Sequence, residues 1–186
     1  LHESEISMTA AVAPNNSGFA IGTSQHVRYY NASGTEIWRV AAPGTTWQVN
    51  ISESGRWVVA AFSDGTIHWY TAKDGMEHLT LFAHTDHRRW VLWTPSGYFA
   101  AGPGSEDLIG WHLNRGKDLA ADFFPASRFR GQYYRPDVVA KVIETADIQE
   151  AVRLADLDAN RKPRTEMAGV ALPPIVQILA PSGEVS

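Results

Sequence analysis

Glycines that recur at a nearly constant spacing constrain the fold of this chain more than any other feature of its sequence. One set follows the first strand-like run of each copy, at Gly18, Gly55 and Gly97, and a second set follows the third run, at Gly34, Gly75 and Gly116. The spacings are 37 and 42 residues in the first set and 41 and 41 in the second. A repeat of roughly 40–45 residues built from four short strands is typical of a β-propeller blade.

An aromatic residue lies five positions before the second glycine in all three copies, at Tyr29, Tyr70 and Trp111. Large aromatic side chains pack well on strands, so we expect these three residues to occupy equivalent core positions. The alternative is a β-sandwich whose hairpins are evenly spaced by chance. The shared aromatic position favours the propeller.

Within each copy, runs rich in β-branched and aromatic residues end at Gly, Pro, Asn or Asp, which is the pattern of short strands joined by turns. The predicted strands are 7–13, 19–23, 26–31 and 35–41 in the first copy, 46–52, 56–62, 66–71 and 76–83 in the second, and 88–94, 98–101, 108–113 and 120–124 in the third. We therefore predict a mainly β protein, a partial propeller of about three four-stranded blades spanning about 5–42, 45–84 and 88–124 within residues 1–125.

Three blades do not close a ring, because propellers have about four to eight. An open set leaves strand edges unpaired, and such edges invite pairing with other chains. We therefore expect this chain to be the C-terminal part of a larger propeller. Otherwise its open blade edges must be covered by its own tail or by self-association with a second copy.

Residues 126–159 are predicted to form a strap and a short helical hairpin. The segment 126–135 is aromatic and basic, and is either a loop whose rings pack across the propeller while its arginines reach solvent or a surface for a partner or an anion. Pro136 and Asp137 suit the first turn of a helix, and Asp147 with Glu150 forms a capping-box-like pair before a second helix at 148–159. We expect the hairpin to cover a flank of the propeller or to link to a neighbouring module, with dimerisation as the alternative. Residues 160–186 are predicted to be a linker and the first strand of a following β module.

Composition excludes several classes of function. The net charge is −4 and no basic stripe appears, which argues against nucleic-acid binding. The chain has no Cys, so it has no disulfide and no thiolate metal ligand. No apolar run approaches the roughly 18 residues of a membrane helix, so we expect no membrane partner.

The segment Ser63-Asp64-Gly65-Thr66-Ile67-His68-Trp69-Tyr70-Thr71 resembles the second turn and third strand of a WD40 repeat. Tyr70 stands where the family has Trp, and Thr71 where it has Asp. The resemblance implies that Asp64 bonds back towards a histidine in the loop between blades, a role that His84 would fill. Tyr30, Thr71 and His112 replace the family's Asp, so packing must do more of the work of holding the blades together.

Four further segments carry a more specific resemblance: 93–99 (WTPSGYF), 110–116 (GWHLNRG), 124–129 (FPASRF) and 134–139 (YRPDVV). Together they are similar to the end of bacterial WD40-repeat proteins that continue into an immunoglobulin-like strand and a caspase-like (metacaspase-type) peptidase domain. The resemblance implies a propeller that regulates or targets a peptidase. It places no protease in this chain, which has no Cys to serve as nucleophile.

Two hypotheses for function remain. In the first, the chain is a non-catalytic interaction scaffold without a cofactor, which binds a protein partner or a neighbouring domain through Trp47, Arg88, Arg89 and Trp90, because interface cores are enriched in Trp and Arg. The same Trp residues suit packing between blades equally well. In the second, the chain is a ligand- or metal-binding propeller with a site near the central channel, formed by His84, Asp86 and His87.

Overall fold

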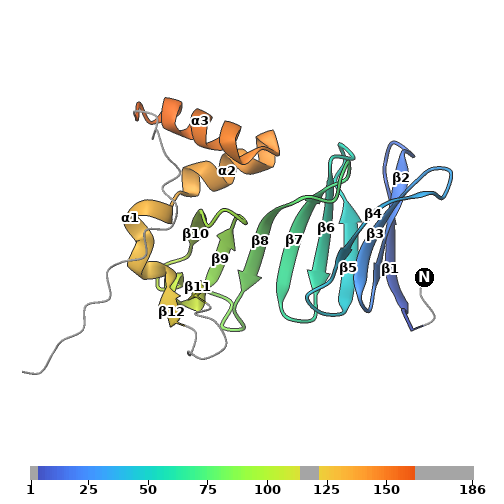
Figure 1. Cartoon of the computed structure of the whole chain (residues 1–186), viewed down its shortest axis with the longest axis horizontal. Helices are drawn as coiled ribbons and strands as arrows, with labels where there is room; N and C mark the ends of the chain where they lie inside the picture. The colour runs from blue at the N-terminus through green and yellow to red at the C-terminus, as the bar shows by residue number, and fades with distance from the viewer. Residues whose placement is uncertain (1–3, 114–121, 162–186) are drawn as a thin grey trace, which may run out of the picture.

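Antiparallel strands form most of the described part of the chain, residues 4–113 and 122–161 of this computed structural model (Figure 1). The first copy contributes β1 (Ser7–Val12), β2 (Gly18–Thr23), β3 (His26–Asn31) and β4 (Glu36–Ala41), and the second contributes β5 (Thr46–Ile51), β6 (Trp57–Phe62), β7 (Thr66–Thr71) and β8 (Glu77–Ala83). The third contributes β9 (Trp90–Trp93), β10 (Phe99–Ala101), β11 (Gly110–Leu113) and β12 (Asp122–Pro125). Short helical turns η1 (Glu106–Leu108), η2 (Ala126–Phe129) and α1 (Arg130–Tyr133) accompany the longer helices α2 (Pro136–Thr145) and α3 (Ile148–Asp158). The predicted mainly β class is confirmed.

The first two copies fold as predicted, each into four strands that pair antiparallel in chain order. The repeated glycines explain the hairpins: Gly55 and Gly75 have φ of +69° and +73°, a conformation that glycine adopts without steric cost. The two sheets pack face to face, one beside the other, as consecutive blades of a propeller do (Figure 1). The fold is therefore an open, partial propeller.

The third copy does not form a separate four-stranded sheet, and that prediction is wrong. Strand β9 turns back on β8 and pairs with it, from Thr80↔Trp93 to Ala83↔Trp90, so the β9–β10 hairpin extends the second sheet to six strands. Strands β11 and β12 form their own two-stranded sheet. The cause is the tight turn before β9, where the Asp86 carboxylate accepts the backbone NH of Arg88 and of Arg89 and reverses the chain at once. The division of the chain at residues 125 and 159 stays a prediction.

The two stacked sheets match pair for pair, and the match corrects one detail of the repeat. The pair Tyr30↔Glu36 between β3 and β4 corresponds to Tyr70↔Glu77 between β7 and β8. Tyr30, not Tyr29, is therefore the counterpart of Tyr70. The segment between the paired residues is one residue shorter in the first copy than in the second. Counting five positions back from Gly34 and from Gly75 therefore reaches Tyr29 and Tyr70, which are not equivalent in the two sheets.

Tyr29 and Tyr70 nevertheless meet in one core, which they enter from opposite sheets. Tyr29 stacks on Trp38 with a centroid distance of 5.6 Å, and Trp38 meets Tyr70 at 6.2 Å. The indole Nε1 of Trp38 donates to the carbonyl of Ala72 at 2.8 Å and so joins the two sheets. Trp111 lies elsewhere, in the cluster of β11 and the strap, where its ring is 4.9 Å from that of Phe129.

Helices α2 and α3 cover the face of the six-stranded sheet that points away from β1–β4. This confirms the prediction that the hairpin covers a flank. Val138, Val139 and Val142 of α2 are buried together with Leu79 of β8. Arg56, from the turn between β5 and β6, donates from Nη1 to the carbonyl of Glu144 at 2.6 Å and from Nη2 to that of Thr145, and so caps the C-terminus of α2.

The second helix begins at the predicted cap. The carboxylate of Asp147 accepts the backbone NH of Gln149 at 2.8 Å and of Glu150 at 3.0 Å. The reciprocal half of the predicted capping box does not form, because the NH of Asp147 donates to the Thr145 hydroxyl and Glu150 pairs with Arg153.

The strap predicted as an irregular loop forms the short helical turns η2 and α1 instead. Its aromatic residues pack inward as the strap interpretation requires: the ring of Tyr134 lies 5.5 Å from that of Phe99, and Tyr133 lies 6.0 Å from Tyr98. Arg130 lies over the Tyr134 ring at 4.0 Å. Gly116, the side chain of His112, and the linker and strand predicted after residue 161 lie outside the described residues. In the described part of the chain, no helix has the length and apolar character that crossing a membrane requires.

Candidate functional site

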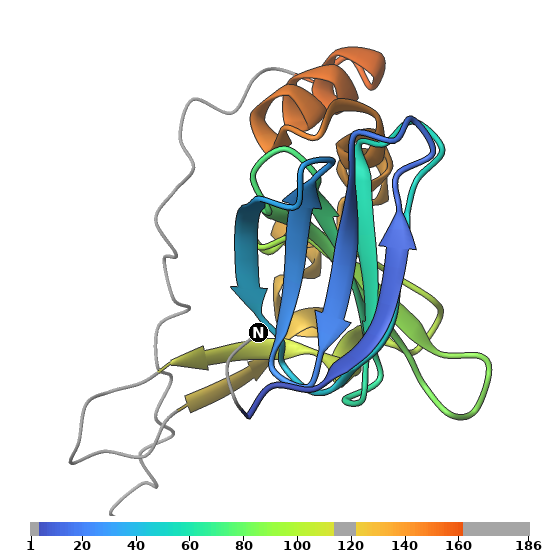
Figure 2. The ribbon, with the colours of Figure 1, turned by 90° about the vertical axis from the view of Figure 1, so that its right-hand side faces the viewer.

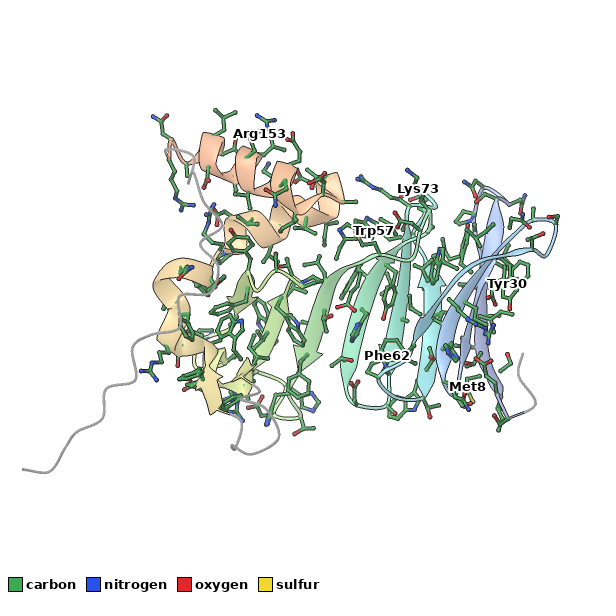
Figure 3. All side chains as sticks on the ribbon, in the orientation of Figure 1. Met8, Tyr30, Trp57, Phe62, Lys73 and Arg153 are labelled. Carbon is green, nitrogen blue, oxygen red and sulfur yellow. The ribbon has the colours of Figure 1, made fainter. Side chains whose placement is uncertain are left out.

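The predicted binding residues lie where β5 and β9 begin, at one end of the two stacked sheets. Trp47 is the second residue of β5, and Arg88 and Arg89 immediately precede Trp90, the first residue of β9. Figure 3 labels Met8 near the start of β1 and Phe62, the pairing partner of Thr46, towards this same end, whereas Trp57 and Lys73 lie at the other. Strands β6, β7 and β8 lie between β5 and β9 in the sheet, so Trp47 and Trp90 are not side by side. We call the set Met8, Trp47, Arg88 and Trp90 the strand-start surface.

A β-bulge at the start of β5 exposes Trp47. Pairing with β6 shifts between Thr46 and Gln48, so Trp47 falls outside the regular ladder, and its side chain is 65% exposed. The same shift occurs in β1 between Ser7 and Thr9, and exposes Met8 to 49%. Bulges re-aim single side chains out of a sheet, and these two do so at equivalent positions of neighbouring strands.

The two arginines before β9 differ in how free they are. The carboxylate of Asp86 accepts the Nε of Arg89 at 2.6 Å as well as the backbone NH of Arg89 and Arg88. The backbone NH and the guanidinium of Arg89, with the NH of Arg88, hold the pKa of Asp86 well below its usual range. Arg89 is therefore part of the turn, whereas the exposed guanidinium of Arg88 has no hydrogen-bond partner in residues 4–113 or 122–161.

Trp90 combines packing with exposure. Its backbone NH donates to the Ser105 hydroxyl at 3.2 Å, and its indole lies so close to Gly102 that an added Cβ there would come within 3.0 Å of Nε1. The side chain still remains 39% exposed. The packing interpretation thus applies to one edge of Trp90, whereas Trp47 is mostly exposed to solvent.

The metal hypothesis finds little support in the turn that was expected to form the site. Nδ1 of His84 lies 3.2 Å from Asp86 Oδ2, but Nη2 of Arg89 lies 3.3 Å from the same nitrogen and 3.2 Å from Nε2, so a cation already lies against the imidazole ring. His87 sits in the left-handed region with φ of 59°. Among the described residues, no group of three or more His, Cys, Asp or Glu side chains is placed to hold a metal ion.

Saturating zinc is expected to leave the thermal midpoint of unfolding unchanged. A site filled at a hundred times its Kd would stabilise the fold by about 2.7 kcal/mol and raise the midpoint by several degrees. Differential scanning fluorimetry with and without zinc, with His84→Ala as the comparison, measures this. A rise of several degrees that His84→Ala removes would reinstate the metal site.

The hydrogen bond that the WD40 resemblance implies for Asp64 does not form among the described residues. The Asp64 carboxylate instead accepts the backbone NH of Thr66 at 3.0 Å and its hydroxyl at 2.6 Å, and so closes its own turn. His84 is engaged by Asp86 and Arg89. The prediction that packing holds the sheets together agrees with this geometry.

A groove at the opposite end of the sheets was not predicted, because its walls come from distant segments. It has a volume of about 730 Å³ and lies between the turns after β1, β5 and β7 and the turn that joins α2 to α3. His78 lines it, packed edge-on against Trp57 at 5.3 Å, and burial lowers the pKa of His78. Within the described residues, no Ser or Thr hydroxyl of this groove bonds to a histidine ring, so it does not hold the pair that activates a nucleophile.

Comparisons with known proteins return structures rather than sequences. No family model and no curated protein matches this sequence. Solved structures that share part of the fold include BamB from Moraxella catarrhalis, with 18% identity over 51% of this chain and 34% of that one and a TM-score of 0.38. They also include U3-55K, with 11% identity over 52% and 38% and a TM-score of 0.43, and the RRP9 WD40 repeats, with 13% over 52% and 37% and a TM-score of 0.42. In each comparison the match spans less than two fifths of the solved chain.

Proposed function

We propose that this chain is a non-catalytic protein-interaction scaffold that binds its partner through the strand-start surface. The observation that carries the proposal is the bulge that leaves Trp47 65% exposed. A large aromatic side chain held on a rigid strand offers apolar contact area at little entropic cost, and Trp and Arg dominate binding energy at interfaces. The exposed guanidinium of Arg88 and the exposed part of Trp90 lie at the same end of the sheets, beyond β6, β7 and β8, while Arg89 positions the turn from which Arg88 projects.

The partner that we propose is a caspase-like peptidase domain, carried on the same polypeptide or met as a neighbour, so that the scaffold regulates or targets the peptidase. The resemblance of roughly residues 90–181 to bacterial proteins of that organisation supports this choice. The exposed side chains of Trp47 and Arg88 support a role in recognition.

Replacing Trp47 with alanine is expected to weaken binding of an immobilised bacterial caspase-like peptidase domain at least tenfold, because removal of a central aromatic residue costs about 2 kcal/mol or more. Leu157→Ala is the matched control, since Leu157 is 64% exposed on α3, away from this surface. Biolayer interferometry measures both. Equal affinities of the two variants would reject the strand-start surface, and failure of the wild-type chain to bind would reject the peptidase as partner.

A further inference from the structure

The outer face of the β1–β4 sheet carries a group of apolar side chains on β1–β3 and has no described element packed on it. Arg28, Glu36 and Arg39 lie on the same face, towards β4. Figure 2 looks directly at this sheet, and no described helix or strand lies in front of it. The residues that pair across this face are Ala10, Val12, Phe19, Ile21 and Tyr30. Val12 is 68% exposed, and Phe19 stacks on Tyr30 at 5.1 Å with the rings 10° from parallel. We call this set of five residues the outer face.

The outer face is the counterpart of a surface that is already an interface in this protein. The pairing of the two sheets matches the outer face, residue by residue, to Val49, Ile51, Val58, Ala60 and Tyr70 of β5–β7. These five are at most 6% exposed, because the inner face of β1–β4 packs on them. These five positions are apolar or aromatic in both sheets, so this part of the face keeps the character of a surface that receives a sheet. The match ends towards β4, where the exposed Arg39 corresponds to the buried Thr80.

A polar pair also recurs at the same place in both sheets. In the second sheet, His68 of β7 lies 3.1 Å from Glu77 of β8, within the stacked interface. Its counterpart in the first sheet is Arg28 with Glu36, and Glu5 adds a second carboxylate on the guanidinium. Only 4% of the Arg28 side chain is exposed, although it belongs to an uncovered sheet. A cation neutralised and sequestered in this way is compatible with burial under a further apolar layer.

Helices α2 and α3 cover the face of the second sheet that points away from β1–β4. The face of β7 and β8 that corresponds to the inner face of β1–β4 carries Trp69 and Leu79, and these residues pack against α2 and α3. Two copies of this chain therefore cannot stack head to tail, because the helical hairpin occupies the surface that one copy would have to present to the outer face of the next.

We propose that the outer face receives a further four-stranded antiparallel sheet, stacked as β1–β4 is stacked on β5–β8. The chemistry of the occupant follows from the established interface. Its contacting face resembles the inner face of β1–β4, with small side chains such as Ala20 and Val27 on the inner strands and rings such as Tyr29 and Trp38 towards the outer strand.

A tandem chain tests this proposal. Residues 1–42 are joined directly to residues 4–186, so that the three residues Ser4, Glu5 and Ile6 replace Pro43, Gly44 and Thr45 between an added sheet and the present one. The added sheet then presents the same inner face that β5–β8 already receives. Val12→Lys is introduced either in the present sheet, whose outer face the added sheet is expected to cover, or in the added sheet, whose own outer face stays open.

The lysine in the present sheet is expected to lower the thermal midpoint of the tandem chain by about 5 °C or more, because it must bury an ammonium group. The same lysine in the added sheet, or in the single chain, is expected to shift the midpoint by about 1 °C or less, since Val12 is exposed there. Equal shifts at the two positions of the tandem chain overturn the proposal. Light scattering of the single chain adds a second test: a stable dimer that Val12→Lys dissociates would assign the outer face to a second copy instead.

Discussion

Replacing Trp38 with alanine is expected to lower the free energy of unfolding by about 3–5 kcal/mol, the cost of deleting a large buried aromatic side chain. Trp38 is only 8% exposed, stacks on Tyr29, and donates its Nε1 proton to the carbonyl of Ala72 across the two sheets. Its indole also lies against Gly75, where an added Cβ would come within 2.6 Å of the ring. Alanine removes all three contacts and leaves a cavity between the sheets.

Urea denaturation followed by circular dichroism measures this loss. Two further variants serve as comparisons. Trp38→Phe keeps an aromatic ring but not the hydrogen bond, so we expect an intermediate loss of about 1–2 kcal/mol. Trp47→Ala removes the same side chain from an exposed bulge and is expected to change stability by about 0.5 kcal/mol or less. Similar losses for Trp38→Ala and Trp47→Ala would contradict the assignment of one residue to the core and the other to the surface.

Local chemistry made the hairpins and helices predictable. Glycines with positive φ end the turns, and Asp147 caps α3 as its position before an apolar helix indicated. The register of Tyr29 was not predictable by counting, because one turn is a residue shorter and only the strand pairing reveals it. The strand pairing of the third copy was not predictable either. A four-stranded blade and an extension of the second sheet use the same strands, and the two differ only in the strand with which β9 pairs.

The candidate site was predictable in its residue types but not in its geometry. Exposed Trp and Arg near strand starts can be recognised in the sequence, whereas a bulge is a property of pairing with the neighbouring strand and does not appear in a single strand. The partnership of Arg89 with Asp86 was overlooked, although an acidic residue three positions before an arginine in a short turn is a usable signal. The buried ion pair of Glu5 joins segments 23 residues apart, and hydrophobic periodicity carries no information about such a contact.

Glu5 is expected to make the stability of this protein strongly dependent on acid pH. Its carboxylate accepts Arg28 Nε at 3.1 Å and Arg28 Nη2, and it also receives the Thr23 hydroxyl and lies 3.0 Å from His26 Nδ1. The hydrogen bond from Arg28 outweighs the opposing effect of burial, and with the contacts from Thr23 and His26 it lowers the pKa of Glu5 from 4.5 to about 2. The folded state therefore keeps the charge over a range of pH in which the unfolded state takes up a proton.

The sign of the effect follows from that difference. Above pH 4.5 both states are ionised at this residue and the contribution, about 3 kcal/mol, is fully present. It declines as the pH falls from 4.5 towards 2, so about 2 kcal/mol is lost by pH 3. Glu5→Gln cannot titrate, so the difference in unfolding free energy between the wild-type chain and this variant is expected to shrink by that amount between pH 6 and pH 3. Glu36 shares the Arg28 guanidinium with Glu5 and contributes to this difference, whereas carboxylates away from Arg28 cancel in the comparison. A difference that does not vary with pH would show that Arg28 does not hold Glu5 in its charged form.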